Sequence, residues 1–320
     1  MPFLAQSGRS QVSNWTKANH TVRKITKSCS TTIWKNEGCL RSGKRWGGVV
    51  KNFIAKRLKK FPARFGLRPV EENDRVNSYT IMGRALSYAR LDSEMQKFLT
   101  HSKSQHGQDW LVEKLTGQKP NEGYFVEFGA VNGIQNSNTY YMEKILGWKG
   151  IVGEPARKWH EALRKNRGCS IETRCVYKNT GDQLEFVETG SWMGGNTLSA
   201  HKNDDGAYRE ISDRYIVDTI SLNDLLKTHN APKYIDFMSV DTEGSEFEIL
   251  NAFDFSQASF GVILVEHNRV ETKRQAIRSL LEENGYKHMQ IPEEISVVDD
   301  WYASANIYKA FEALVAKQSA

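Results

Sequence analysis

The stretch that decides the fold is YFVEFGAVNG, residues 124–133. It is a short, β-rich apolar run that ends at Gly129, and a second glycine, Gly133, follows at GxxxG spacing. This differs from the GxGxxG pattern that lets a backbone approach a pyrophosphate at a helix N-terminus. An acid, Glu127, stands two residues before the first glycine. A buried strand that ends in such a turn is typical of ligand sites at the carboxyl edge of an α/β sheet.

Working outward, the apolar pattern switches repeatedly between strand and helix periods after about residue 104. Helical spacings separate the predicted strands, and Ser221 with Asp224 has the spacing of a capping box at one helix start. Strands that alternate with helices of 10–15 residues predict βαβ units and a mostly parallel sheet. The strand-like runs are 124–130, 150–154, 170–177, 184–189, 234–241 and 261–267.

The end of the second run supports a ligand site. GIVGEP places Glu154 about 25 residues after Gly129. An acid there can accept hydrogen bonds from both hydroxyls of a ribose, as in nucleotide-binding Rossmann folds. The alternative is an acid that favours a helix N-terminus, since Pro155 suits a first helical position. We expect Glu127 and Glu154, from neighbouring strands, to converge on one ligand.

Charge is distributed unevenly along the chain. Residues 1–70 hold 16 Lys and Arg but one acid, Glu37, whereas residues 71–320 hold 28 Lys and Arg and 37 acids. We therefore expect a basic, partly disordered extension over 1–70, a helical lead-in over 71–103 and the main domain over 104–320. Within the extension, apolar residues at helical spacing predict an amphipathic helix near 49–61.

Composition limits the classes of protein. An apolar content of 39% and a charged content of 26% exclude wholesale disorder and collagen-like repeats, and no apolar run is long enough to span a membrane. The four cysteines form no CxxC pair, so neither a zinc knuckle nor a disulfide framework is indicated. We expect a cytoplasmic protein. The alternatives for the basic N-terminus are organellar targeting, contact with an anionic membrane or nucleic acid, and a solubilising tail.

Five blocks make the sequence recognisable: SQHGQDWLVEKL (104–115), FVEFGAVNGIQNSNTYYMEKILGWKGIVGEP (125–155), VDTISLNDLL (217–226), IDFMSVDTEGSEFEIL (235–250) and ILVEHN (263–268). Over about residues 102–303 the chain resembles the FkbM-type family of class I S-adenosylmethionine-dependent methyltransferases. The resemblance implies a Rossmann-like α/β sheet of seven strands, one antiparallel, flanked by helices. It also implies S-adenosylmethionine as methyl donor and O-methylation of a hydroxyl on a sugar, glycan or secondary metabolite.

The resemblance also assigns roles to residues. It puts the glycine-containing turn around the methionine moiety, Glu154 at the ribose, Cys175 and Val176 beside the adenine, and Gln105 and Asp109 as residues that close over the cofactor. Asp241, Glu243 and Glu246 follow the fourth strand, where acceptor and methyl group meet. The residues implied around the methionine moiety are Glu127, Gly129, Ala130, Asn132 and Gly133.

Methyl transfer to a hydroxyl needs alignment and help with proton removal. The candidate bases are Asp241, Glu243, Glu266 and His267, and His267 has the ordinary pKa best suited to the task. The same four residues could instead hold Mg²⁺, which would acidify the hydroxyl. A third alternative is that the acids only cap helix N-termini.

Two other functions remain open at this point. The basic extension could serve an RNA-modifying methyltransferase, although no N/D-P-P-Y/F block or Pro-Cys pair is present. The domain also looks like that of animal Star-type proteins, which favours a binding protein without turnover. The sequence does not specify the acceptor or the oligomeric state.

Overall fold

The computed structural model describes residues 98, 100–117, 119–190, 195–204, 208–291 and 298–317. The chain divides into two compact units, Met1–Arg75 with Gln318–Ala320, and Val76–Lys317. All described residues belong to the second unit. The helix predicted near 49–61, and the lead-in up to residue 97, lie outside them, so those boundaries stay predictions.

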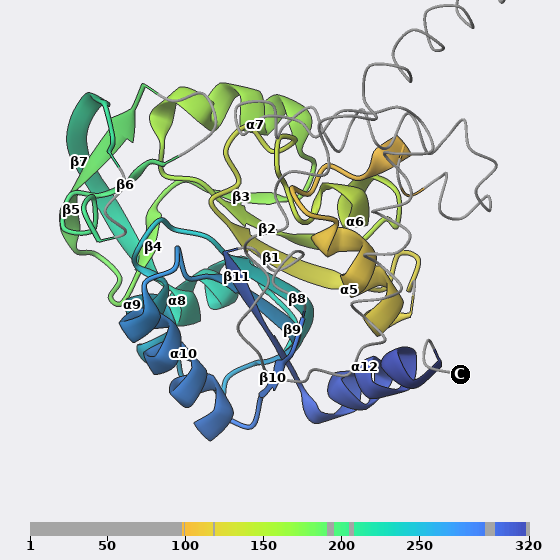
Figure 1. The fold of residues 1–320 in the computed structure, drawn as a ribbon. Coiled ribbons are helices and arrows are strands. Elements are labelled where there is room, and N and C mark those ends of the chain that lie inside the picture. The colour runs from red at the N-terminus through yellow and green to blue at the C-terminus, as the bar shows by residue number, and fades with distance from the viewer. Residues whose placement is uncertain are drawn as a thin grey trace, which may run out of the picture. The chain divides into compact units, whose positions relative to one another are not determined.

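A seven-stranded sheet forms the centre of the second unit (Figure 1). Its strand order is β10-β11-β9-β8-β1-β2-β3, and β11 pairs antiparallel with both of its neighbours. The other pairings are parallel. This confirms the predicted α/β sheet with one antiparallel strand. The strands are β1 (Tyr124–Phe128), β2 (Lys149–Gly153), β3 (Ser170–Glu172), β8 (Tyr234–Val240), β9 (Ser259–Glu266), β10 (Lys287–Met289) and β11 (Asp299–Ala303).

Helices cover both faces of this sheet. Alternate side chains of its buried strands point to opposite faces, so each face has its own apolar core that helices must cover. On β1, Val126 and Phe128 belong to one core and Phe125 to the other. The first core is closed by α8 (Leu222–Thr228), α9 (Glu246–Asn251) and α10 (Glu271–Glu283). The second is closed by α5 (Gln108–Thr116), α6 (Tyr140–Lys144), α7 (His160–Asn166) with η4 (Arg157–Trp159) before it, and α12 (Ala305–Lys317).

Local sequence explains where α8 begins. The hydroxyl of Ser221 accepts a hydrogen bond from the backbone N–H of Asp224 over 3.2 Å, which is the predicted cap. Leu222, Leu225 and Leu226 then bury the apolar face of the helix. Because β7 ends at the capping serine, the helix starts as soon as the strand stops.

A second, four-stranded sheet was not predicted. Its order is β4-β7-β5-β6, and it lies beside the main sheet at the left of Figure 1. The single strand predicted over 170–177 is wrong: it is two strands, β3 and β4, in different sheets. Glu172 accepts hydrogen bonds from both the backbone and the guanidinium of Arg174, which turns the chain between them. The strands are β4 (Cys175–Tyr177), β5 (Gln183–Thr189), β6 (Thr197–Leu198) and β7 (Ile211–Ser221).

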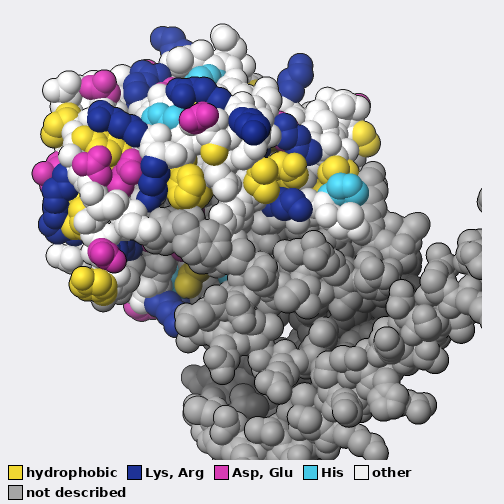
Figure 2. Space-filling model, turned by 90° about the horizontal axis from the view of Figure 1, so that it is seen from above, with side chains coloured by type: hydrophobic (Ala, Val, Ile, Leu, Met, Phe, Trp, Pro, Cys, Tyr) yellow, Lys and Arg dark blue, Asp and Glu magenta, His cyan; other side chains and the backbone are white. Residues whose placement is uncertain are grey.

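The surface of the described part carries both signs of charge. The face seen from above shows more Lys and Arg than Asp and Glu side chains (Figure 2). Around η4 and α7, Arg157, Lys158, Arg164 and Lys165 are exposed. Among the described residues, no helix is long and apolar enough to cross a membrane.

Candidate functional site

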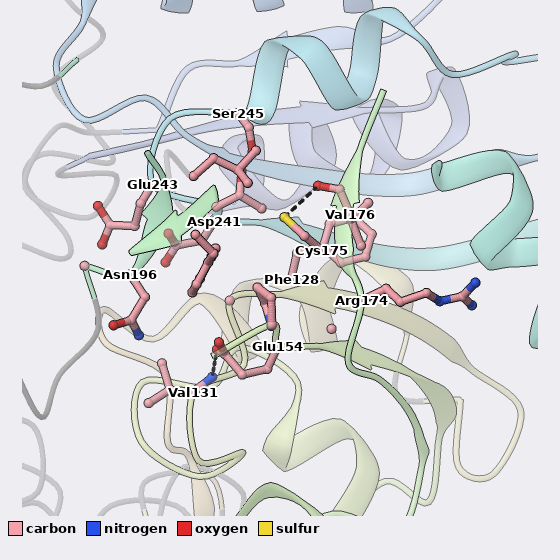
Figure 3. A pocket seen from close by; sticks show the side chains of 17 residues that line it. Phe128, Val131, Glu154, Arg174, Cys175, Val176, Asn196, Asp241, Glu243 and Ser245 are labelled. Atoms are coloured by element: carbon pink, nitrogen blue, oxygen red, sulfur yellow. Dashed lines mark hydrogen bonds between the residues drawn. The ribbon is translucent and has the colours of Figure 1, made fainter. Parts of the chain in front are cut away.

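A cavity lies at the carboxyl ends of β1, β2 and β8, between the main sheet and the four-stranded sheet (Figure 3). These ends meet because β1 pairs in parallel with both neighbours, so that Phe128 lies beside Gly153 and Val240. The cavity is lined by Phe128, Gly129, Val131, Gly153, Glu154, Pro155, Arg174, Cys175, Val176, Phe186, Gly195, Asn196, Leu198, Asp241, Thr242, Glu243 and Ser245.

At position 129, in the wall of this cavity, there is no room for a side chain. The φ of Gly129 is +77°, and a Cβ there would lie 2.1 Å from the carbonyl oxygen of Asp241. Both the backbone conformation and the contact therefore require glycine. The N–H groups of Gly129 and Ala130 donate to the carbonyl of Gly153, which fixes the first turn against the end of β2.

Glu154 lines the cavity and is 3% exposed. Its two carboxylate oxygens accept hydrogen bonds from the backbone N–H groups of Val131 and Ala156, each over 2.8 Å. Burial raises the pKa of Glu154 to about 7, against the opposite effect of these two bonds. Each oxygen retains capacity for a second hydrogen bond. The side chain can therefore accept from a pair of hydroxyls while it holds the turn at Val131.

The opposite wall is less polar. Cys175 and Val176 are buried on β4, and burial raises the pKa of the Cys175 thiol to about 12, so the thiol is neutral. Arg174 lines the cavity but points away from its centre (Figure 3) and pairs with Glu172 over 2.7 Å. A neutral wall in a cavity that also holds acidic side chains suits an uncharged base attached to a cationic group.

Three carboxylates gather beyond the end of β8. Asp241, Glu243 and Glu266 offer oxygens that lie within 4.8 Å of one another. Burial, and then the neighbouring carboxylates, raise the pKa of both Asp241 and Glu266 well above the ordinary range, and the two side chains share a hydrogen bond. Burial and like charge therefore both favour a proton on this pair. Three of the four predicted residues thus come together in space, without His267, and the three carboxylates are arranged so that they could also hold a divalent cation.

The loop that carries these acids is internally braced. One oxygen of Glu246 accepts hydrogen bonds from the N–H groups of Thr242 and Gly244 and from the Thr242 hydroxyl. Glu243, between them, has a positive φ of 58°. Glu246 is 3% exposed and does not line the first cavity. Its contacts hold Glu243 in a conformation that is unfavourable for most residues.

Glu127 lies outside the cavity. Its carboxylate accepts from the hydroxyls of Ser137 and Thr139 and from the backbone N–H of Asn138, and it pairs with Arg167 over 3.3 Å. Arg167 is buried as well. Strand alternation explains the direction, because Glu127 and Phe128 point to opposite faces of the sheet. The structure therefore does not bring Glu127 and Glu154 together around one space.

The other residues predicted in the first turn shape it rather than line the cavity. Ala130 belongs to the second core. Asn132 accepts from the N–H groups of Ile134 and Gln135 through Oδ1. A Cβ at Gly133, where φ is +80°, would lie 2.6 Å from the side chain of Arg167.

The two candidates before β1 also lie away from the lining. Gln105 is partly exposed. Asp109 is fully buried, accepts from Ser102 and Ser104 over 2.9 and 2.6 Å, and has a pKa raised by burial to about 6. Its second oxygen has no hydrogen-bond partner among the described residues.

Next to it, the sequence analysis missed a buried contact. Gln108 donates to Asp299 over 3.0 Å, across 191 residues of chain. Asp299 is the register partner of Glu266 on β9. No local spacing could have indicated this pair, because β11 was not predicted.

His267 lies beside a second, smaller cavity that Glu243 and Glu266 also line. It is 7% exposed, and its Nδ1 accepts from the backbone N–H of Arg269 over 3.0 Å. Burial lowers the pKa of His267 below the ordinary value. The imidazole is therefore neutral near pH 7, with Nδ1 already engaged.

Comparison with known proteins identifies the domain. A family model described as "Methyltransferase FkbM domain" matches residues 127–288, which run from the end of β1 into β10. A search of curated proteins found no match.

Solved structures give weaker likenesses. Methyltransferase FkbM from Methylobacillus flagellatus KT has 10% identity and a TM-score of 0.37, and the match covers 78% of this chain. The chain spans 59% of the length of that protein. An O-methyltransferase from Bacillus cereus in complex with SAH has 14% identity and a TM-score of 0.37, covering 80% of this chain and all of the other. The SAH-bound Podospora anserina methyltransferase PaMTH1 has 12% identity and a TM-score of 0.38, covering 74% and 97%.

Proposed function

Because the chain belongs to the FkbM family of methyltransferases, we propose that it methylates a hydroxyl oxygen of a sugar, glycan or secondary metabolite with S-adenosylmethionine as donor. The observation that carries the proposal is the cavity at the ends of β1, β2 and β8, which combines a glycine cradle, a buried carboxylate and a neutral wall. Each of these three features fits one part of the donor.

The donor is a nucleoside attached to a cationic amino acid, and the lining matches that chemistry. Glu154 would accept hydrogen bonds from the ribose hydroxyls, and Cys175 with Val176 would contact the adenine. The backbone at Gly129 and Val131 would approach the methionine part, since no side chain at Gly129 intervenes. Glu127 is proposed instead to hold the 137–139 segment through its buried contacts.

When bound, S-adenosylmethionine supplies an activated methyl group. The chain must then orient an acceptor hydroxyl and take up its proton. We assign proton uptake to the carboxylate of Asp241, because it lines the cavity and is hydrogen-bonded to Glu266. The hydrogen bond between them acts to lower the pKa of Asp241 and to raise that of Glu266, which favours the shared proton on Glu266 and leaves Asp241 as the carboxylate that accepts the proton of the hydroxyl. His267 is the weaker candidate, because its Nδ1 already accepts from Arg269.

The acceptor class follows from the polar groups near Asp241. Asn196 and Glu243 lie on the same side of the cavity as Asp241 (Figure 3), and Ser245 also lines it. Amide, carboxylate and hydroxyl groups together suit a ligand with several hydroxyls. This supports a sugar or a similarly hydroxylated metabolite.

Magnesium stays an alternative route to the same result. Asp241, Glu243 and Glu266 would hold the ion, and the acceptor hydroxyl would lose its proton more easily beside it. Addition of MgCl₂ to EDTA-treated protein tests this directly. If methyl transfer rises with the metal, Asp241 is a ligand rather than the base.

The experiment that tests the function uses the full chain with S-adenosylmethionine and extracts of metabolites and glycans. Mass spectrometry should find a hydroxylated compound that gains one methyl group only when donor and protein are both present. A methylated product confined to RNA would support the RNA-modifying alternative. Donor binding without any product would support a binding protein that lacks turnover.

A further inference from the structure

Arg209 reaches from the segment before β7 to the edge of the cavity. Its Nη2 donates to Oε2 of Glu243 over 2.9 Å, and the side chain of Arg209 is 7% exposed. The same guanidinium donates through Nε to the carbonyl of Gly195 over 3.2 Å and through Nη1 to the carbonyl of Lys202 over 2.9 Å. One side chain thus joins the 195–202 segment to a carboxylate of the candidate site.

A second contact ties the same two segments together. The hydroxyl of Thr197 on β6 donates to the backbone carbonyl of Glu243 over 2.9 Å. Gly195 and Glu243 both line the cavity, so these bonds lie at the junction of two of its walls. The backbone of Glu243 is fixed by Thr197 and the Glu246 brace, and its side chain by Arg209.

Charge explains why an arginine is needed at this place. Oxygens of Asp241, Glu243 and Glu266 lie within 4.8 Å of one another, so like charges repel across the group. Asp241 and Glu266 are hydrogen-bonded to each other. Arg209 places a positive charge beside Glu243. Its planar guanidinium donates to one carboxylate and two backbone carbonyls at the same time, whereas the compact ammonium group of a lysine would not reach all three.

We propose that Arg209 is a positioning residue for methyl transfer, which fixes the carboxylate of Glu243 at the cavity wall and neutralises its charge beside the donor site. The inference rests on the proposed function, because it assumes that the donor binds in this cavity. The inference adds that Arg209, which lies outside the main sheet, controls the net charge beside the bound donor.

The charge beside the donor site can be tested by comparing the binding of two ligands that have nearly the same shape. S-adenosylmethionine carries a positive sulfonium, whereas S-adenosylhomocysteine carries a neutral sulfur. Titration calorimetry of the full chain gives the ratio of their dissociation constants. In Arg209→Gln, Glu243 loses its counter-charge, so preference for the sulfonium should rise by roughly threefold or more over wild type. In Glu243→Gln, the unpaired Arg209 should lower that preference by a similar factor.

The double variant Arg209→Gln with Glu243→Gln should return the ratio to near the wild-type value, even if both affinities fall. Arg214→Gln is the matched control, since Arg214 lies on β7, the strand that follows Arg209, and pairs with Glu185 at the exposed surface. A purely structural role would weaken both probes equally and leave every ratio unchanged, which would overturn the inference. If wild type binds neither probe, the proposed function fails instead.

Discussion

The backbone N–H of Val131 donates to Oε2 of Glu154 over 2.8 Å, and this bond joins the turn after β1 to the end of β2. Val131 has a positive φ of 49°, which is unfavourable for a β-branched residue. The buried carboxylate therefore stabilises a strained turn at the same point where it lines the cavity. The sequence predicted that Glu127 and Glu154 converge on one ligand, whereas in the structure Glu154 alone lines the cavity and holds the turn after β1.

The close contact between Gly129 and the Asp241 carbonyl predicts that a side chain at position 129 destabilises the chain by more than backbone strain alone. In Gly129→Ala, a Cβ would lie 2.1 Å from the Asp241 carbonyl, so the backbone must shift. We expect the free energy of unfolding to fall by about 3 kcal/mol or more, with loss of S-adenosylhomocysteine binding. Gly107→Ala is the control, because Gly107 has nearly the same φ and nothing within 4 Å of its Cβ. It should cost only about 1 kcal/mol and keep binding; equal losses in both variants would refute the steric account.

Asp299 predicts a pH-dependent change in stability. Burial raises its pKa from 3.8 to about 7 in the folded chain. The stability that depends on its proton is thus fully present below the unfolded pKa and is lost as pH rises toward and through 7. Asp299→Asn removes this loss. At pH 8 it should increase the free energy of unfolding by roughly 2–4 kcal/mol, with little change near pH 4. Urea unfolding at the two pH values measures it.

The next residue, Asp300, supplies the control for that prediction. Burial opposes its ionisation, but hydrogen bonds from His288 and Arg274 hold the pKa of Asp300 below its ordinary value. Its contribution to stability is present above the unfolded pKa and is lost as pH falls. Asp300→Asn should therefore destabilise the chain at pH 8, the opposite of Asp299→Asn. If both variants changed the free energy of unfolding in the same direction at pH 8, the opposite pKa shifts assigned to Asp299 and Asp300 would be wrong.

Glu127 predicts a loss of stability without a loss of binding. Its removal leaves buried Arg167 with one fewer carboxylate, so Glu127→Gln should lower the free energy of unfolding by about 3 kcal/mol. Affinity for S-adenosylhomocysteine should stay within twofold of wild type. Glu185→Gln, which breaks an exposed pair with Arg214, should leave the free energy of unfolding nearly unchanged. If a well-folded Glu127→Gln variant bound S-adenosylhomocysteine weakly, Glu127 would belong to the donor site after all.

Asp241 predicts a defect confined to the chemical step. Asp241→Asn keeps the size of the side chain but cannot take up a proton. Once an acceptor is known, single-turnover rates should fall by about 10²–10⁴ while donor affinity is retained. His267→Ala is the comparison, and we expect a smaller effect because its Nδ1 is engaged with Arg269. The larger loss in His267→Ala would transfer the role of base to the histidine.

The sequence could predict elements whose cause is local. The apolar runs of β1, β2, β8 and β9 are buried strands, and Ser221 caps α8 through the bond that its spacing indicated. β7 was missed, because its first eight residues, ISDRYIVD, mix apolar and polar side chains without strict alternation. In the sheet beside the cavity, β5 was predicted as a strand over 184–189, but β6 and β7 were not, so the sheet itself was not predicted.

Directions of side chains were harder to predict than positions along the chain. Glu127 and Glu154 both occupy the predicted strand ends, yet only Glu154 faces the cavity. The partner of Glu127 is Arg167, 40 residues away, and no spacing indicates that pairing. Arg209 was missed for the same reason, since its contact with Glu243 spans 34 residues. Such contacts depend on tertiary packing, which local patterns do not encode.

Calorimetric titration of the full chain with S-adenosylhomocysteine, beside the Glu154→Ala variant, tests the central claim most directly. We predict micromolar binding to wild type and a loss of at least about tenfold in Glu154→Ala, because the ribose hydroxyls lose their acceptor. Unchanged affinity in that variant, or no binding to a folded wild-type chain, would contradict a donor site between β1, β2 and β8.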